Sequence, residues 1–122
     1  PKTLDVVGGR GGGANHHPGN QNYWMKVLCS RSSYRSSKND KEKTDIAQRI
    51  IDDIESEGGR FVQRDGNDPE KRWFNLPNKV ILAKVKQALR DQYIPLWAPV
   101  LGSEHFIDFI KIIWLYAHHA VV

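Results

Sequence analysis

The sequence predicts a small α+β domain with three helices and a β-hairpin. Three segments repeat their apolar residues at the spacing of one helix face, and a turn-rich stretch at 65–70 separates two short β-prone runs. With 122 residues and a hydrophobic content of 39%, the chain can bury one modest core. We expect one module over residues 1–92 and an apolar C-terminal extension over residues 93–122.

The N-terminal part is a strand candidate followed by a glycine-rich loop. The strand is expected over residues 3–7, and six glycines and a proline lie between Gly8 and Asn20. Such a loop ahead of a helix can hold an anion with its backbone amides. However, no βαβ unit with a ribose-binding acid is evident after it, and the Gly-Lys-Ser/Thr of a Walker loop is absent. We therefore expect an ordered surface turn that packs on the first helix.

The first helix is expected to begin near Gln21, with Asn20 as its cap. Serines are unfavourable inside helices, so the helix should fray in the serine-rich stretch at 30–37. Cys29 is expected to be a small core residue rather than a reactive thiol. The apolar face that predicts this helix consists of Tyr23, Trp24, Val27 and Leu28.

The second helix has clear signals at both ends. Asn39 and Glu42 form a capping box, and Gly58 with Gly59 provides the stop. Its apolar stripe consists of Ile46, Ala47, Ile50, Ile51 and Ile54. Its C-terminal half is acidic, so this helix is unsuited to contact with phosphates.

A hairpin and a third helix follow. The hairpin strands are expected at 60–64 and 72–76, on either side of the turn-rich stretch. Pro77 and Asn78 open the third helix. Its apolar stripe consists of Ile81, Val85, Ala88 and Leu89. The order helix, helix, hairpin, helix loosely resembles a winged helix, although the acidic second helix would be a poor groove-reading element.

The C-terminal extension contains a very apolar run at 106–117. The run is shorter than the roughly 20 apolar residues of a membrane span. We expect it to form a helix that is buried or that binds a partner.

Composition favours a basic intracellular protein without catalysis. The formal charge of +4 favours polyanion partners. A single cysteine, Cys29, allows neither an internal disulfide nor a cysteine-based zinc site, which fits a reducing nuclear or cytoplasmic location. No secretory signal is visible at the first residues. The histidines do not form a ready chelate and no nucleophile motif occurs, so we expect no metal, no cofactor and no enzyme.

The charge distribution points to a nucleic-acid contact. No acid occurs between Asp5 and Asp40, while basic and aromatic residues alternate there. The hairpin adds further arginines, whose alternative role is an ordinary polar face. The candidate nucleic-acid-binding residues are Arg10, Gly11, Gly12, Gly13, Lys26, Arg31, Arg35, Arg60, Arg64 and Arg72.

An ordered series of motifs adds a resemblance to a known family. The series consists of Asp-Val-Val-Gly-Gly-Arg-Gly-Gly-Gly from Asp5, Asn15, His-Pro-Gly-Asn from His17, Gly-Gly-Arg-Phe from Gly58, Trp73-Phe74 and Gln-Ala-Leu-Arg from Gln87. It resembles a domain of unknown function that recurs in predicted proteins of diatoms and related algae. The resemblance covers roughly Leu4 to Asp91 and implies one compact module, but it implies no activity and no ligand.

Two functions follow as expectations. The first is a nucleic-acid-binding or chromatin-associated module that contacts DNA or RNA without catalysis. The alternative is a protein-interaction or self-association module, with a protein partner or a homodimer formed through Trp24, Trp97 and the helix from Phe106 to Tyr116.

Overall fold

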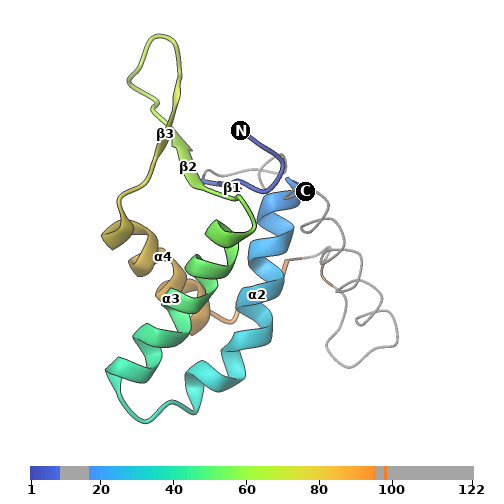
Figure 1. Cartoon of the computed structure of the whole chain (residues 1–122), viewed down its shortest axis with the longest axis vertical. Helices are drawn as coiled ribbons and strands as arrows, with labels where there is room; N and C mark the ends of the chain where they lie inside the picture. Colours follow the sequence, from blue (N-terminus) through green and yellow to red (C-terminus); the bar gives the residue numbers. More distant parts are fainter. Residues whose placement is uncertain (9–16, 96–97, 99–122) are drawn as a thin grey trace.

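The chain forms three helices and a small three-stranded sheet, which confirms the predicted α+β class. The structure is a computed structural model that describes residues 1–8, 17–95 and 98 (Figure 1). The described elements are β1 (Val6–Val7), α2 (Pro18–Arg35), α3 (Asp40–Ser56), β2 (Phe61–Arg64), β3 (Trp73–Asn75) and α4 (Asn78–Arg90). Most of the glycine-rich loop and the predicted C-terminal helix lie outside the described residues.

The sheet has the strand order β1-β2-β3. The antiparallel pair β2–β3 confirms the predicted hairpin, with Gln63 opposite Phe74. β1 pairs with β2 in parallel, with Val6 opposite Phe61. β1, α2, α3 and β2 therefore form a strand–helix–helix–strand unit, which differs from the single-helix unit of a dinucleotide-binding fold. Sequence periodicity could not indicate it, because β1 has only 2 residues.

The first predicted strand is shorter than expected because a turn precedes it. The Asp5 amide donates to the Lys2 carbonyl oxygen at 3.1 Å, and the Lys2 amide donates to the Asp5 carboxylate at 2.7 Å. These two hydrogen bonds fold the backbone before Val6, so that only Val6 and Val7 are left to pair with β2.

Helix α2 differs from its prediction at both ends. It begins at Pro18 with His17 as the cap, because proline suits the first position of a helix. The Asn20 side chain is therefore not a cap. The helix also continues through the serines to Arg35, because Arg31 and Tyr34 are buried against the other helices and hold its last turns in place.

The signals predicted for α3 are present in the structure. The Glu42 amide donates to the Asn39 side chain at 2.9 Å, while the Glu42 carboxylate accepts from the Lys38 amide at 2.8 Å. The second bond of the capping box thus goes to the residue before the cap. At the other end Gly58 has a φ of 90°, a conformation that glycine adopts without strain.

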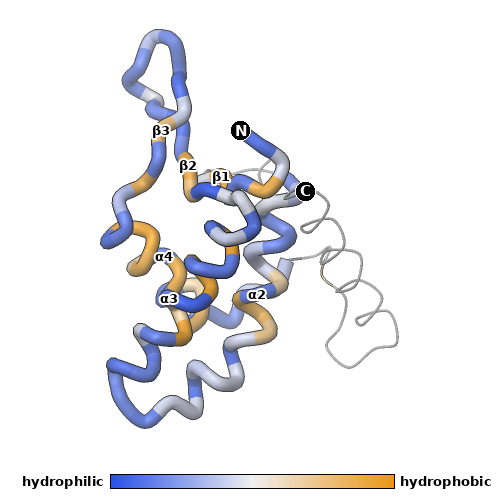
Figure 2. Tube along the Cα trace, in the orientation of Figure 1, coloured by the Kyte–Doolittle hydropathy of each residue, from blue (hydrophilic) through white to orange (hydrophobic). Residues whose placement is uncertain are grey.

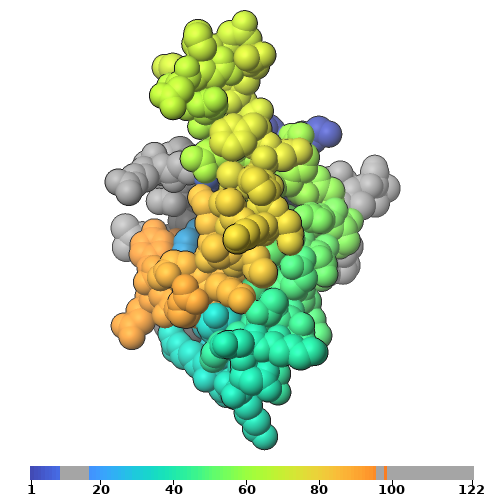
Figure 3. All heavy atoms as spheres, turned by 90° about the vertical axis from the view of Figure 1, so that its left-hand side faces the viewer, coloured from blue at the N-terminus to red at the C-terminus, as the bar shows by residue number. Residues whose placement is uncertain are grey.

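The core lies between the three helices and under β2. The predicted stripes of α3 and α4 meet there, with Ile51, Ile54, Val85 and Leu89 fully buried. Figure 2 shows that the tip of the hairpin and the turn between α2 and α3 are hydrophilic, and Figure 3 shows the hairpin projecting beyond the helices. Cys29 is exposed, so its predicted core role is wrong: the buried face of α2 passes through Val27, Leu28 and Arg31 instead.

Candidate functional site

A buried carboxylate ties the N-terminal segment to the sheet. Asp5 is completely buried and accepts hydrogen bonds from the Arg60 amide at 3.1 Å and from the Arg60 Nη2 at 2.7 Å. Burial alone would raise the pKa of Asp5, but the hydrogen bonds from Arg60 and the Lys2 amide outweigh it and hold the pKa below its ordinary value. Arg60, a predicted nucleic-acid contact, is therefore the partner of a structural carboxylate.

Two glycines allow the backbones around Asp5 to approach closely. A Cβ atom on Gly19 would overlap the Asp5 carbonyl group, and one on Gly59 would overlap the Leu4 carbonyl oxygen. Asn20 completes the junction, because its side chain accepts from the Val7 amide at 2.6 Å and donates to the Val7 carbonyl at 2.9 Å. The ends of the glycine-rich loop are thus held at one place, and we name this set the β1 junction: Leu4, Asp5, Val7, Gly19, Asn20, Gly59 and Arg60.

Two further predicted contacts on α2 also have internal partners. Lys26 forms an ion pair with Glu57, which in addition accepts from the Asn22 side chain at 3.0 Å. Arg31 is 6% exposed, and its Nε and Nη2 donate to the Ala88 carbonyl oxygen at 3.2 and 3.0 Å. Arg31 therefore links α2 to the end of α4.

The hairpin arginines interact within the hairpin. Arg72 donates to the Asp68 carboxylate at 2.7 Å and lies 3.5 Å from the Glu70 carboxylate. Arg64 stacks over the ring of Trp73, with 4.9 Å from its guanidinium carbon to the ring centre. Neither is brought close to Arg35, the remaining predicted contact.

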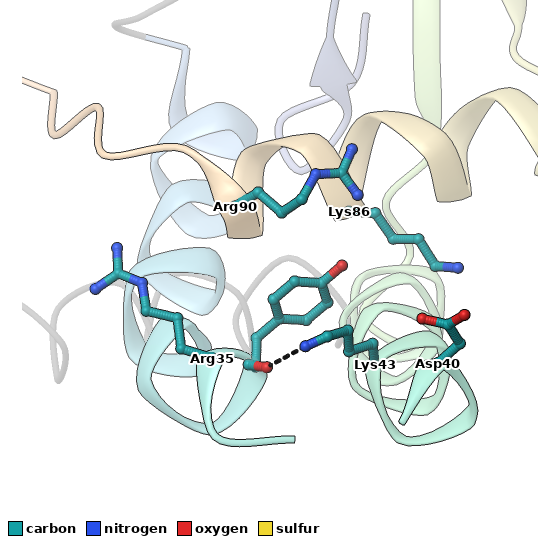
Figure 4. A pocket seen from close by; sticks show the side chains of 6 residues that line it. Arg35, Asp40, Lys43, Lys86 and Arg90 are labelled. Carbon is teal, nitrogen blue, oxygen red and sulfur yellow. Dashed lines mark hydrogen bonds between the residues drawn. The ribbon is translucent and has the colours of Figure 1, made fainter. Parts of the chain in front are cut away.

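Arg35 belongs to a different cluster, at the end of the helical layer away from the sheet. It lines a hollow of about 590 Å³ between the end of α2, the beginning of α3 and the second half of α4 (Figure 4). We name this the basic hollow. Its lining residues are Tyr34, Arg35, Asp40, Lys43, Lys86 and Arg90.

The basic hollow concentrates unneutralised positive charge. Four cations and one acid line it, so that its net formal charge is +3. All ion pairs among the described residues involve other cations, and none joins a cation of the hollow to a carboxylate within 4.0 Å. Lys43 instead donates to the Tyr34 carbonyl oxygen at 3.3 Å, and Arg90 donates to the Gln87 side chain at 3.0 Å. The arrangement can attract an anion into a concave surface.

The comparison with protein families decides the family of the chain. The model of a domain of unknown function, DUF6824, matches residues 5–91. The chain belongs to this family. Comparison with curated proteins and with solved structures gave no match.

The match confirms that the chain contains a domain of unknown function. It begins at a residue with a clear structural role. The DUF6824 match starts at Asp5, the buried carboxylate of the β1 junction. Three of the quoted motifs meet there: the strand from Asp5, the His-Pro-Gly-Asn motif with Gly19 and Asn20, and the Gly-Gly-Arg-Phe motif with Gly59 and Arg60. In this chain these motif residues join the N-terminal segment to the sheet and to α2.

Sequence reasoning alone does not select Lys43, Lys86 or Arg90, although they form the basic hollow with Arg35. One local signal was available, because Lys86 and Arg90 stand four residues apart and therefore share a face of α4. Lys43 could not be associated with them, because nothing in the sequence indicates that the beginning of α3 packs near the end of α4.

Several predicted features lie outside the described residues, namely Arg10, Gly11, Gly12, Gly13, Trp97 and the helix from Phe106 to Tyr116. His17 is described, and its Nε2 lies 3.1 Å from the Lys2 carbonyl oxygen, within hydrogen-bond distance. Within residues 1–8, 17–95 and 98, no group of His, Cys, Asp or Glu side chains could hold a metal ion. No helix in the same ranges is both long and apolar enough to cross a membrane.

Proposed function

We propose that this DUF6824 domain is a nucleic-acid-binding module that acts without catalysis and contacts phosphates through the basic hollow. The cations that would make these contacts are Arg35, Lys43, Lys86 and Arg90. A chromatin-associated role and a nuclear or cytoplasmic location accompany this proposal. Arg10 and the amides of Gly11 to Gly13 remain predicted additional contacts.

The observation that carries the proposal is that four cations from three helices line one hollow without a carboxylate partner within 4.0 Å among the described residues. Like charges around one hollow repel one another, and a bound polyanion relieves this repulsion while releasing its own counterions. Neutral or cationic ligands would gain no attraction from the net positive charge of this surface. A polyphosphate backbone fits it better than any ligand class with less charge.

The proposal also changes the set of contacts expected from the sequence. Lys26, Arg31 and Arg60 already have internal partners, and moving them to a phosphate would remove bonds that join elements of the fold. Of the predicted described residues, Arg35 alone lines the basic hollow. Arg64 and Arg72 provide a matched comparison, because they are cations on the separate hairpin.

A binding titration of two double variants tests the proposal. Lys86→Glu/Arg90→Glu reverses two charges of the basic hollow, while Arg64→Glu/Arg72→Glu makes the same change in net charge on the hairpin. We expect the hollow variant to weaken binding of a labelled oligonucleotide about 10–100-fold at about 50 mM salt, and the hairpin variant to have a much smaller effect. Equal losses would indicate unspecific attraction, and absent binding by the unaltered chain would refute the proposal.

Two further predictions remain, one about the family and one about an alternative function. We propose that DUF6824 recurs in diatoms and related algae with the Gly-Arg-Gly-Gly and Gly-Gly-Arg-Phe motifs, which a survey of family members would check. Self-association through Phe106 to Tyr116 remains the alternative function, and sedimentation of the full chain at several concentrations tests it.

A further inference from the structure

A second hollow lies directly beside the basic hollow. It has a volume of about 600 Å³, and Arg35 lines both hollows. Arg31 also lines it, but the Arg31 guanidinium is already bound to the Ala88 carbonyl oxygen. The rest of its lining differs in character from the basic hollow, because it combines apolar side chains with neutral polar ones. The residues that give it this character are Leu28, Ser32, Ser36, Gln92 and Ile94. We name it the neutral hollow.

We propose that the two hollows together bind one nucleotide of a single-stranded nucleic acid, with its phosphates in the basic hollow and its base in the neutral hollow. The inference rests on the proposed function and specifies its ligand class. A nucleotide within a strand has a phosphate on each side of its sugar. Its base is a flat ring with apolar faces and hydrogen-bonding edges. The basic hollow suits the phosphates, and the adjoining neutral hollow suits the base.

The neutral hollow has the groups that a base requires. Ile94, which is 55% exposed, offers apolar surface to a ring face, and the buried Leu28 is part of the wall of the hollow. The Ser36 hydroxyl donates to the Ser32 carbonyl oxygen at 3.1 Å, so its lone pairs remain available to accept from a base N–H. The Gln92 side chain, which is exposed, can both donate and accept. Arg35, between the hollows, can stack its guanidinium on a base or pair with a phosphate.

A duplex would not use this arrangement. The bases of a duplex are stacked inside it, so that their faces cannot enter a hollow of the protein, whereas single strands turn their bases outward. In a winged-helix arrangement α3 would enter the major groove of a duplex, and α3 is unsuited to this. Asp52, Asp53 and Glu55 are exposed on α3, and their carboxylates would repel duplex phosphates.

Fluorescence anisotropy with the full chain distinguishes these ligands. The probes are a labelled single-stranded oligonucleotide as DNA and as RNA, its duplex, and a single strand of equal length in which all bases are replaced by abasic sites. We expect both base-carrying single strands to bind more tightly than the duplex, and the abasic strand to lose about tenfold in affinity. A preference for either sugar agrees with the inference, because both strands carry bases and phosphates.

Variants of the neutral hollow supply the second measurement. Gln92→Ala and Ser36→Ala should shrink the affinity difference between the normal and abasic strands without altering abasic binding, whereas Lys86→Glu/Arg90→Glu should weaken binding to both. Thermal unfolding checks that each variant is folded.

The outcomes separate this inference from the proposed function. If the duplex binds as tightly as the single strand, or the abasic strand as tightly as the normal one, the inference is refuted while phosphate binding stands. If none of the probes binds at low salt, the proposed function fails and the inference fails with it. If Gln92→Ala weakens normal and abasic strands equally, the base is not held in the neutral hollow, and the inference is again refuted.

Discussion

The β1 junction and the basic hollow use positive charge in opposite ways. At the junction Arg60 is bound to the buried Asp5, so the cation is neutralised and joins two parts of the chain. Around the hollow Lys86 and its three neighbouring cations have no carboxylate partner within 4.0 Å among the described residues. The difference teaches that the motif residues of this DUF6824 chain stabilise the fold, while less conspicuous lysines and arginines carry the charge available to a ligand.

The largest expected effect is on the stability of the β1 junction. Gly19→Ala places a Cβ atom on the Asp5 carbonyl group, where only backbone movement can relieve the overlap. We expect the free energy of unfolding to fall by about 3 kcal/mol or more, as measured by urea denaturation. Gly66→Ala is the control, because a Cβ atom there meets nothing within 4 Å. Similar losses at both positions would mean that close packing at Gly19 is unimportant.

Loss of the buried carboxylate should have the next largest effect. Asp5→Asn keeps the shape of the side chain but removes its charge and places an amide group where donors converge. We expect a loss of about 2 kcal/mol in the free energy of unfolding at pH 7. A variant as stable as the unaltered chain would show that the ion pair with Arg60 contributes little.

This loss should depend on pH in a defined direction. The pKa of Asp5 is lower in the folded chain than its ordinary value of 3.8, so the folded state binds fewer protons there than the unfolded state. The stabilising contribution is therefore complete above pH about 4 and is lost as the pH falls through the folded pKa. The stability difference between the unaltered chain and Asp5→Asn should shrink below pH 4. A constant difference from pH 7 to pH 2 would contradict this assignment.

The basic hollow should respond in the opposite way and with a smaller effect on stability. Lys86→Gln removes one of several repelling charges and breaks no ion pair among the described residues. We expect the free energy of unfolding to rise by a few tenths of a kcal/mol at low salt, with the gain disappearing at about 1 M salt. Destabilisation by about 1 kcal/mol would show that Lys86 supports the fold, and the contrast between the two regions would then be lost.

The helices and the hairpin could be predicted because their signals are local. The capping pair Asn39–Glu42 and the stripe of α4 depend only on neighbouring residues, and both are confirmed. The sequence predicts Arg31 as a nucleic-acid contact because a cation is ordinarily exposed. In the structure Arg31 is buried, and its two donors bind the carbonyl oxygen of Ala88, which is distant in sequence. Tertiary contact likewise extends α2 through residues of weak helix propensity.

The candidate site was harder to predict, since it exists only after packing. Arg35 could be selected from its basic surroundings, but the basic hollow also requires Lys43 and Lys86 from two other helices. The β1 junction could not be predicted for a related reason. Gly19 and Gly59 are required because the N-terminal backbone at Leu4 and Asp5 passes close to both of them, and this contact exists only in the folded chain. In each case the sequence contains the residues, and only the arrangement in space reveals their partners.

The most direct test of the contrast is the salt dependence of binding to one single-stranded oligonucleotide. With four phosphate contacts, the slope of log affinity against log salt concentration should be about −3 for the unaltered chain. We predict that Lys86→Glu/Arg90→Glu reduces this slope by about half, while Arg64→Glu/Arg72→Glu leaves it nearly unchanged. An unchanged slope in the hollow variant, or an equal reduction in the hairpin variant, would contradict the assignment of phosphate binding to the basic hollow.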